Sequence, residues 1–177
     1  MGLDSSLYSI DEGGWLRLEA QRKFRRRANE MCEARFWPVI DVLPKDENGI
    51  VSVKALSDRQ RNDFFTIAND YRETMKKVAS EFGVDLDENL SFKKADMGNE
   101  VYEFGGDDWA LYHFIVQNFW HGDGKANCVA IRLLEGDLER LVEFCGGNVG
   151  ENPDADAFAE ALEDVRNGRI VYYYPWY

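Results

Sequence analysis

Apolar residues recur at three- and four-residue steps early in the chain, and this spacing predicts an amphipathic helix from Trp15 to about Arg35. The repeating apolar positions are Leu16, Ala20, Phe24, Ala28 and Met31 with Cys32. Pro38 is expected to end this helix, because the residue before a proline avoids the α region.

A second stretch has the same spacing and predicts the clearest helix of the chain. Ser57 and Gln60 resemble a capping box at its start, and Gly83 is expected to stop it. The repeating apolar positions are Phe64, Ala68, Tyr71, Met75, Val78 and Phe82.

Shorter patterns predict the remaining elements. Two β-branched runs flank Asn48-Gly49 and predict a hairpin with strands near 39–43 and 50–54. Further strands are expected at 7–10, 101–104, 128–134 and 169–177. Further helices are expected at 109–120, at 137–145 and from Asp154 or Asp156 to Gly168.

This order of elements predicts the fold class. About five helices and five or six short strands follow one another without a strict βαβ alternation. We therefore expect an α+β fold, with a mostly antiparallel sheet covered on one face by the helices. The 177 residues fit a single domain, 1–177.

The composition of the chain limits the cellular compartments in which we expect the protein. No apolar run approaches the roughly 18 residues of a membrane span, and the first residues, MGLDSSLYSIDEGG, lack the basic and apolar regions of a secretion signal. The three cysteines are odd in number and form no Cys-x-x-Cys motif. We therefore expect reduced thiols in a cytoplasm, no membrane contact, no metal and no cofactor.

The charge of the chain is lopsided. Residues 1–94 carry 16 Lys+Arg against 17 Asp+Glu, whereas residues 95–177 carry 5 against 16, within a net charge of −12. The C-terminal half should repel nucleic acid and suit a basic protein surface. Asp107 and Asp108 precede the helix expected at 109–120 and are counted as binding candidates on this acidic half.

The stretch FWHGDGKANC, residues 119–128, contains residue types found in phosphate and metal sites. A phosphate loop needs G-x-x-x-x-G-K-[ST], but Ala126 follows Gly124-Lys125 and Phe119 stands at the earlier glycine. A metal site would combine His121 and Asp123 with His113, yet the two histidines are eight residues apart, about 12 Å along a helix. We expect an ordinary turn.

A second acidic stretch, residues 85–96, has part of a calcium-loop pattern. The oxygen-bearing residues at loop positions 1, 3, 5, 7 and 12 are Asp85, Asp87, Asn89, Ser91 and Asp96. Leu90 stands where the sharp turn needs glycine, and Asp96 stands where a longer glutamate normally gives bidentate ligation. We do not expect calcium binding.

Cations gather in one place, the stretch QRKFRRRANE of the first helix. Arg22, Arg25 and Arg26 spread around most of the helix together with Lys23 and Arg27. This distribution favours a solvated face with local pairs. A contact with an acidic partner, such as a nucleotide or another subunit, is the alternative.

The terminal sequence YYYPWY is unusually aromatic. In a strand, Tyr172 and Tyr174 face one way and Tyr173 the other, so one set packs on helices and the other is available to a partner. Tyr173 and Trp176 are the binding candidates in this strand. Sheet core and a self-association surface are the two interpretations.

The chain resembles uncharacterised phage and prophage proteins that open with MGLDMYL-type sequences. The likeness rests on MGLDSSLYSI, on Tyr112-His113-Phe114, on the turn HGDGKANC, on VAIRLL, on EGDLERLVEFC and on the aromatic end VYYYPWY. Ser5-Ser6 replaces the family's Met-Tyr. The resemblance implies a phage-type origin and marks His113 as a residue of interest, while the family has no established activity.

Two functional hypotheses follow. The first is a phage-type accessory protein in the host cytoplasm, which acts by binding a basic surface of a host protein through its acidic C-terminal half. The second is a nucleotide- or metal-dependent enzyme that uses the arginine-rich helix for phosphates and His113 for catalysis. A homodimer formed through the terminal strand is a further alternative.

Overall fold

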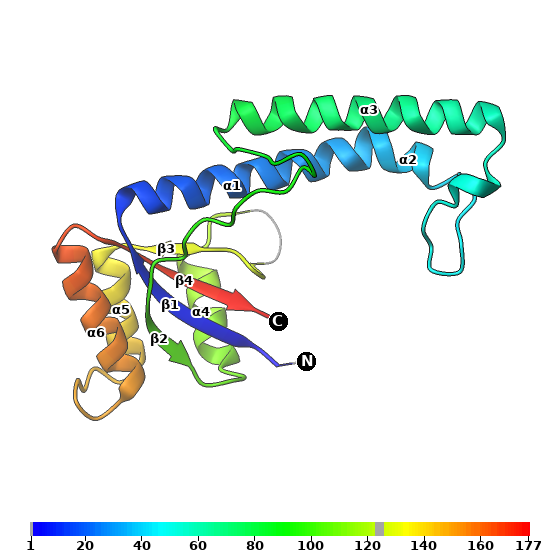
Figure 1. Ribbon diagram of the computed structural model, residues 1–177. Helices are drawn as coiled ribbons and strands as arrows, with labels where there is room; N and C mark the ends of the chain where they lie inside the picture. The colour runs from blue at the N-terminus through cyan, green and yellow to red at the C-terminus, as the bar shows by residue number, and fades with distance from the viewer. Residues whose placement is uncertain (1, 123–125) are drawn as a thin grey trace. The chain divides into compact units, whose positions relative to one another are not determined.

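The computed structural model describes residues 2–122 and 126–177, and the chain divides into two compact units. The first, here called the sheet unit, consists of Met1–Leu16 and Asp96–Tyr177. The second, the helical unit, consists of Arg17–Ala95. Figure 1 labels the elements of both units. Whether they form one domain stays a prediction.

The sheet unit contains an antiparallel sheet of four strands. Their bounds are β1 Asp4–Ile10, β2 Asn99–Phe104, β3 Ile131–Leu133 and β4 Ile170–Trp176. The strand order is β2-β1-β4-β3, so the first and last strands of the chain pair at the centre of the sheet. The α+β class and the antiparallel pairing are confirmed, but the expected five or six strands are wrong.

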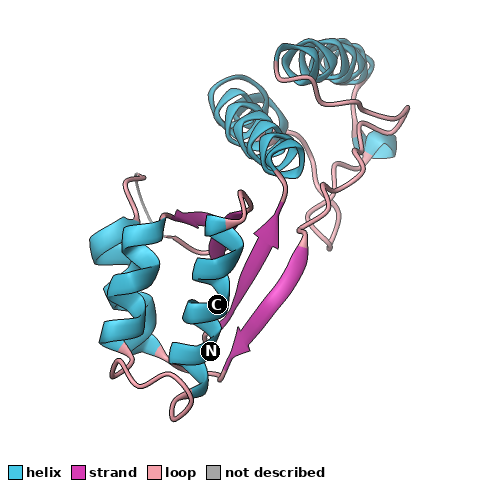
Figure 2. Ribbon diagram, turned by 90° about the vertical axis from the view of Figure 1, so that its left-hand side faces the viewer, coloured by secondary structure: helices cyan, strands magenta, loops and turns pink. Residues whose placement is uncertain are grey.

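Three helices cover one face of this sheet: α4 Trp109–Phe119, α5 Glu135–Phe144 and α6 Pro153–Arg166. Figure 2 shows them together on one side of the strands. The buried core between the layers includes Leu7, Phe104, Ile115, Leu141, Phe158, Val171 and Tyr173. Phe104 stacks on Phe158 with ring centroids 5.2 Å apart, which joins β2 to α6.

The starts of these helices follow local side-chain chemistry. Asp108 caps α4 by accepting the Leu111 backbone N–H at 2.9 Å. The cap of α6 is Asn152, which accepts the Asp154 backbone N–H at 3.0 Å. The expectation that Asp154 or Asp156 caps this helix is therefore wrong, because Pro153 already occupies the first helical turn.

Two long helices, α1 Glu12–Met31 and α3 Asp58–Glu81, form most of the helical unit, which includes α1 from Arg17 onward. Phe24 of α1 lies in one apolar cluster with Val78 of α3, and Cys32 lies in another with Met75. The expected capping box of α3 is confirmed. Together with α4, α5 and α6, these make five α-helices of ten or more residues in the described part of the chain.

Pro38 does not end the helical path. A π-helical segment, Cys32–Phe36, follows α1, and a short helix, α2 Trp37–Ile40, begins next with Pro38 in its first turn. The expected stop is wrong because the wider π turn allows a new helix to start at the proline, where a backbone N–H is not needed.

The expected hairpin near 39–43 and 50–54 is also wrong. Lys45 and Val51 form one isolated antiparallel bridge, and residues Val53–Ala55 form a 3-10 turn. Val42 and Ile50 remain 78% and 64% exposed, so the β-branched runs bury too little apolar surface to form a stable ladder.

Candidate functional site

The face of the sheet opposite the helices is rich in aromatic side chains. Since Leu7, Val171 and Tyr173 lie in the helix-facing core, strand alternation places Tyr8, Tyr172, Tyr174 and Trp176 on the other side. Their rings are in contact: Tyr8 stacks on Tyr172 at 5.3 Å, and Tyr174 lies 6.2 Å from Trp176. We call these four residues the aromatic face.

The strand register sets carboxylates beside these rings. Residues directly opposite each other on paired strands point to the same face of a sheet. Trp176 lies opposite Asp4 of β1, and Tyr8 lies opposite Glu100 of β2. Glu103 pairs with Ser6, which in turn pairs with Tyr174. Each of the three rows therefore combines an acidic residue with an aromatic residue.

A β-bulge brings the two glutamates to one face. Tyr102 pairs with Leu7 but Glu100 pairs with Tyr8, so Val101 is an extra residue in β2. In a regular strand, residues three apart point to opposite faces; the extra residue restores Glu100 and Glu103 to the same side. This edge strand therefore presents two exposed carboxylates beside the aromatic face.

The aromatic face carries negative charge at one edge. Burial and the adjacent Glu100 and Glu103 carboxylates raise the pKa of Tyr8. None of the ion pairs between described residues includes Asp4, Glu100 or Glu103. Arg132 of β3 pairs with Tyr172 and so stands at the opposite edge of the sheet. The carboxylates thus lie near β1 and β2, away from that arginine.

One end of the aromatic face is closed. The Trp15 ring lies 5.5 Å from the Tyr172 ring, and the Tyr172 hydroxyl donates to the Met97 carbonyl at 2.6 Å. Burial raises the pKa of Tyr172 strongly. Gly98 has φ +85°, and a Cβ there would stand 2.5 Å from the Ser9 carbonyl oxygen, so this close approach requires glycine.

Of the two aromatic candidates in the terminal strand, one lies on this face. Trp176 is half-buried among the aromatic face residues. Tyr173 is 0% exposed and packs in the helix-facing core. Alternation in β4 turns Tyr173 toward the core between the sheet and the helices, away from the aromatic face, and its expected contact with a partner stays a prediction.

His113 lies on the surface of α4 among aromatic rings. Its ring centroid is 6.1 Å from that of Trp109 and 5.3 Å from that of Tyr112. The Tyr112 hydroxyl is 3.2 Å from the Tyr177 hydroxyl, and burial together with Tyr177 raises the pKa of Tyr112 to about 12. These contacts place His113 among aromatic rings, and its importance stays a prediction.

The described residues do not form either of the metal sites considered from the sequence. Asp123 lies outside the described residues, as do Gly124 and Lys125 of the same stretch. Within 2–122 and 126–177, no group of three or more His, Cys, Asp or Glu side chains is placed to hold a metal ion. In the calcium-like loop, the Asp87 carboxylate accepts the backbone N–H of Ser91 at 2.8 Å and so closes a local turn.

Asp107 and Asp108 fasten the beginning of the chain to α4. The Asp107 carboxylate accepts the Leu3 backbone N–H at 3.1 Å, while the Asp107 N–H donates to the Leu3 carbonyl at 2.8 Å. Asp108 is the cap of α4. Both side chains therefore have a structural role, and their role in binding stays a prediction.

The arginine-rich stretch lies on exposed α1 in the helical unit. Arg26 pairs with Glu30 at 3.2 Å, and the Arg25 guanidinium lies over the Phe92 ring at 5.0 Å from its centroid. Arg22 is also exposed. Local partners thus use part of the positive charge, in line with the solvated-face interpretation.

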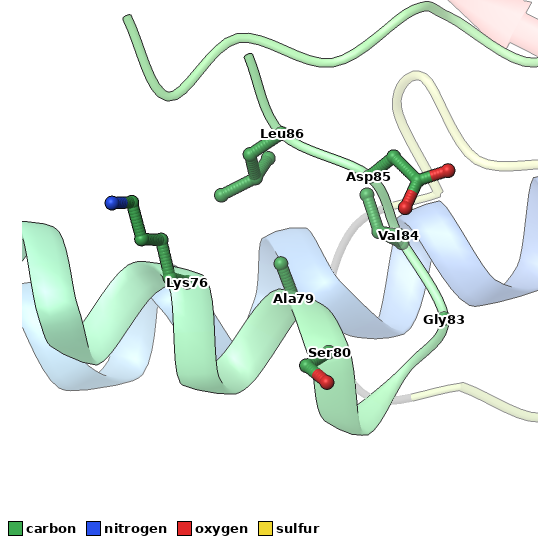
Figure 3. A pocket seen from close by; sticks show the side chains of 7 residues that line it. All are labelled: Lys76, Ala79, Ser80, Gly83, Val84, Asp85 and Leu86. Atoms are coloured by element: carbon green, nitrogen blue, oxygen red, sulfur yellow. The ribbon is translucent and has the colours of Figure 1, made fainter. Parts of the chain in front are cut away.

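An open hollow of about 330 Å³ lies at the C-terminal end of α3 (Figure 3). The close view shows Ala79, Val84 and Leu86 between the Lys76 amine and the Asp85 carboxylate, which point to different sides. Lys76 also pairs with Glu73 at 3.9 Å. Because its polar groups do not converge, this hollow indicates no ligand.

The comparisons leave the resemblance to phage proteins untested. No family model matches the chain, and neither a curated protein nor a solved structure matches it. Among the residues that the structure describes, every helix falls short of the length and apolar character needed to cross a membrane.

Sequence reasoning missed the acidic partners of the aromatic face. Tyr8, Glu100 and Glu103 come together only through the pairing of β1 with β2, about ninety residues apart. The alternation in LYSI was the available signal for Tyr8, since it places Tyr8 and Leu7 on opposite faces of a strand. NEVYEF gave no such signal, because Glu100 and Glu103 reach one face only through the bulge.

Proposed function

We propose that the protein acts by binding, and that its sheet unit engages a basic surface of another protein. The observation that carries this proposal is the division of charge between the units. The sheet unit has 19 acidic and 5 basic residues, a net charge of −14, whereas the helical unit has 14 acidic and 16 basic residues, a net charge of +2. The resemblance to phage proteins supports a host protein as the partner and the host cytoplasm as the place.

Part of the negative charge is used inside the sheet unit. Arg166 of α6 contacts Glu135 at 2.9 Å, Glu163 at 3.1 Å and Glu139 at 3.4 Å. One guanidinium thus holds three carboxylates and joins α5 to α6. A single cation leaves this cluster with net negative charge, so it still adds to the field of the unit.

Other carboxylates of the sheet unit are exposed and take part in none of the ion pairs between described residues: Glu100, Glu103, Glu143 and Glu160. Together with the cluster around Arg166, they give the unit a field of one dominant sign. Such a field repels nucleic acid and steers a basic protein surface toward contact.

The test is salt-dependent capture with the immobilised full chain. Partners from a bacterial lysate are identified at about 0.05 M and about 0.5 M salt, which change the screening length several-fold. The proposal predicts basic proteins that bind at low salt only. It also predicts that E100Q/E103Q/E143Q/E160Q loses them.

A matched variant, E47Q/D63N/E81Q/E88Q, removes the same charge from exposed positions of the helical unit. It should retain the partners. Absence of any salt-sensitive basic partner contradicts the proposal, and so does equal loss in both variants.

No specific observation on the described residues favours the enzyme hypothesis. Among the described residues, the His113 ring contacts the rings of Trp109 and Tyr112, and the Arg26–Glu30 ion pair uses part of the charge of the arginine-rich helix. It stays a prediction, as does the homodimer through the terminal strand. A thermal-shift screen with nucleotides and divalent metals tests the first, since a ligand of the folded state raises Tm.

A further inference from the structure

We infer that the aromatic face, with Glu100 and Glu103 beside it, is the place where the sheet unit holds a partner, and that the occupant is an extended segment with arginine or lysine side chains. This inference rests on the proposed function and adds the site and the chemistry of its ligand. Its physical basis is the combination of ring faces and carboxylates on one side of a sheet.

The rings supply the first attraction. Tyr8 and Trp176 are half-buried, so each keeps part of its ring surface open while its position is fixed by packing. A guanidinium or ammonium within about 6 Å of such a ring is attracted by the negative face of the π system. Arginine stacks on a ring more readily than lysine because its guanidinium is planar and weakly hydrated.

The carboxylates supply the second attraction at the same place. Glu100 lies opposite Tyr8 across β1 and β2, and Asp4 lies opposite Trp176 across β1 and β4. Facing side chains on paired strands start about 5 Å apart. A cation seated on either ring is therefore within reach of a carboxylate that takes part in none of the ion pairs between described residues.

The strand geometry favours an extended segment. The rows that begin at Asp4, Ser6 and Tyr8 are two residues apart along β1, or about 7 Å. Alternate side chains of an extended peptide have the same spacing. In addition, β2 is an edge strand, whose outer backbone groups are not used within the sheet. A segment with basic residues at every second position matches both features.

Charge complementarity selects this occupant. Asp4, Glu100 and Glu103 stand on the β1 and β2 side of the face, while Arg132 stands at the far edge of the sheet. An acidic or neutral segment would leave three carboxylates without a countercharge. A basic segment neutralises them and covers the exposed parts of the rings in the same contact.

The probe is a fluorescent peptide of alternating arginine and threonine, titrated with the full chain at low salt and followed by anisotropy. Lysine and glutamine versions of the peptide serve as comparisons. We expect the arginine peptide to bind most tightly and the glutamine peptide not to bind. E100Q/E103Q should weaken binding about tenfold, while E143Q/E160Q, with the same charge change on α5 and α6, should weaken it less than about twofold.

Aromatic variants test the second component. W176L should weaken binding about threefold to tenfold, and W37L, which removes an exposed tryptophan from the helical unit, should not change it. Circular dichroism spectra that match the wild type exclude misfolding as the cause.

The outcomes separate this inference from the proposed function. Equal weakening in both glutamate pairs overturns the site, because binding would then follow the net charge of the unit. Capture of basic lysate proteins without any peptide binding overturns the site and leaves the proposed function standing.

Discussion

Tyr172 and Tyr173 are adjacent, equally buried and on opposite faces of β4, so their hydroxyl groups form a matched pair for measurement. The Tyr172 hydroxyl donates to the Met97 carbonyl at 2.6 Å. The Tyr173 hydroxyl is buried without a formed hydrogen bond to the described residues, and Ser5 is the polar side chain near it. Replacing each tyrosine with phenylalanine removes these groups and keeps the rings.

A hydrogen bond of this kind contributes about 1 kcal/mol net, and its loss leaves the carbonyl of half-buried Met97 without this donor. We therefore expect Y172F to lower the free energy of unfolding by about 1 kcal/mol and Tm by about 2–4 °C. Y173F should change stability by less than about 0.5 kcal/mol or increase it, because it removes an unsatisfied buried group.

The assay is urea unfolding followed by far-UV circular dichroism, with thermal melts as a second measurement. A constant m-value between variants shows that the midpoints report stability. A loss in Y173F as large as that in Y172F would refute the reasoning, since it would mean that the two hydroxyl groups have the same hydrogen-bonding state.

Three further predictions test other parts of the structure. Burial, with smaller contributions from Asp154 and Asp108, raises the pKa of the Cys145 thiol to about 11. Iodoacetamide at about pH 8 should therefore alkylate Cys145 at least about tenfold more slowly than exposed Cys128. Mass spectrometry measures the two rates, and equal rates would contradict this prediction. Ser57→Ala should destabilise α3 by about 1 kcal/mol in urea unfolding, and no change would contradict the capping geometry. Burial raises the pKa of Tyr173 from 10.0 to about 12, so the stability linked to its neutral hydroxyl is complete below about pH 10 and falls as the pH rises toward 12. Absorbance at alkaline pH should show ionisation of Tyr173 only together with unfolding.

The fold could be predicted where local pattern and tertiary burial agree. The stripe that begins at Phe64 and the Ser57–Gln60 capping box located α3, because both are properties of a single helix. The hairpin failed for the opposite reason. Residues near Val42 and Ile50 have strand propensity but no sheet to join, and propensity without burial does not form strands. Helix continuation past Pro38 depends on a π turn, which leaves no clear mark in sequence.

The candidate site was predictable only in part. The alternation of Tyr172, Tyr173 and Tyr174 follows from strand geometry and is confirmed. Which of the two faces the helices cover depends on contacts with α4 and α6, which the pattern of β4 alone does not contain. For the same reason the sequence of β4 does not show that Tyr8, and not Tyr173, lies on the aromatic face. The carboxylates of β2 join the site through long-range pairing and a bulge, which a single sequence does not specify.

The most direct test of the central claim is a titration of the isotope-labelled full chain with the alternating arginine peptide, followed by amide chemical shifts at low salt. We predict that the largest shifts map to Tyr8, Glu100, Glu103 and Trp176 and decline with distance from them. Shifts spread evenly over α5 and α6, or confined to the helical unit, would contradict the claim that the aromatic and acidic face of the sheet recognises a basic segment.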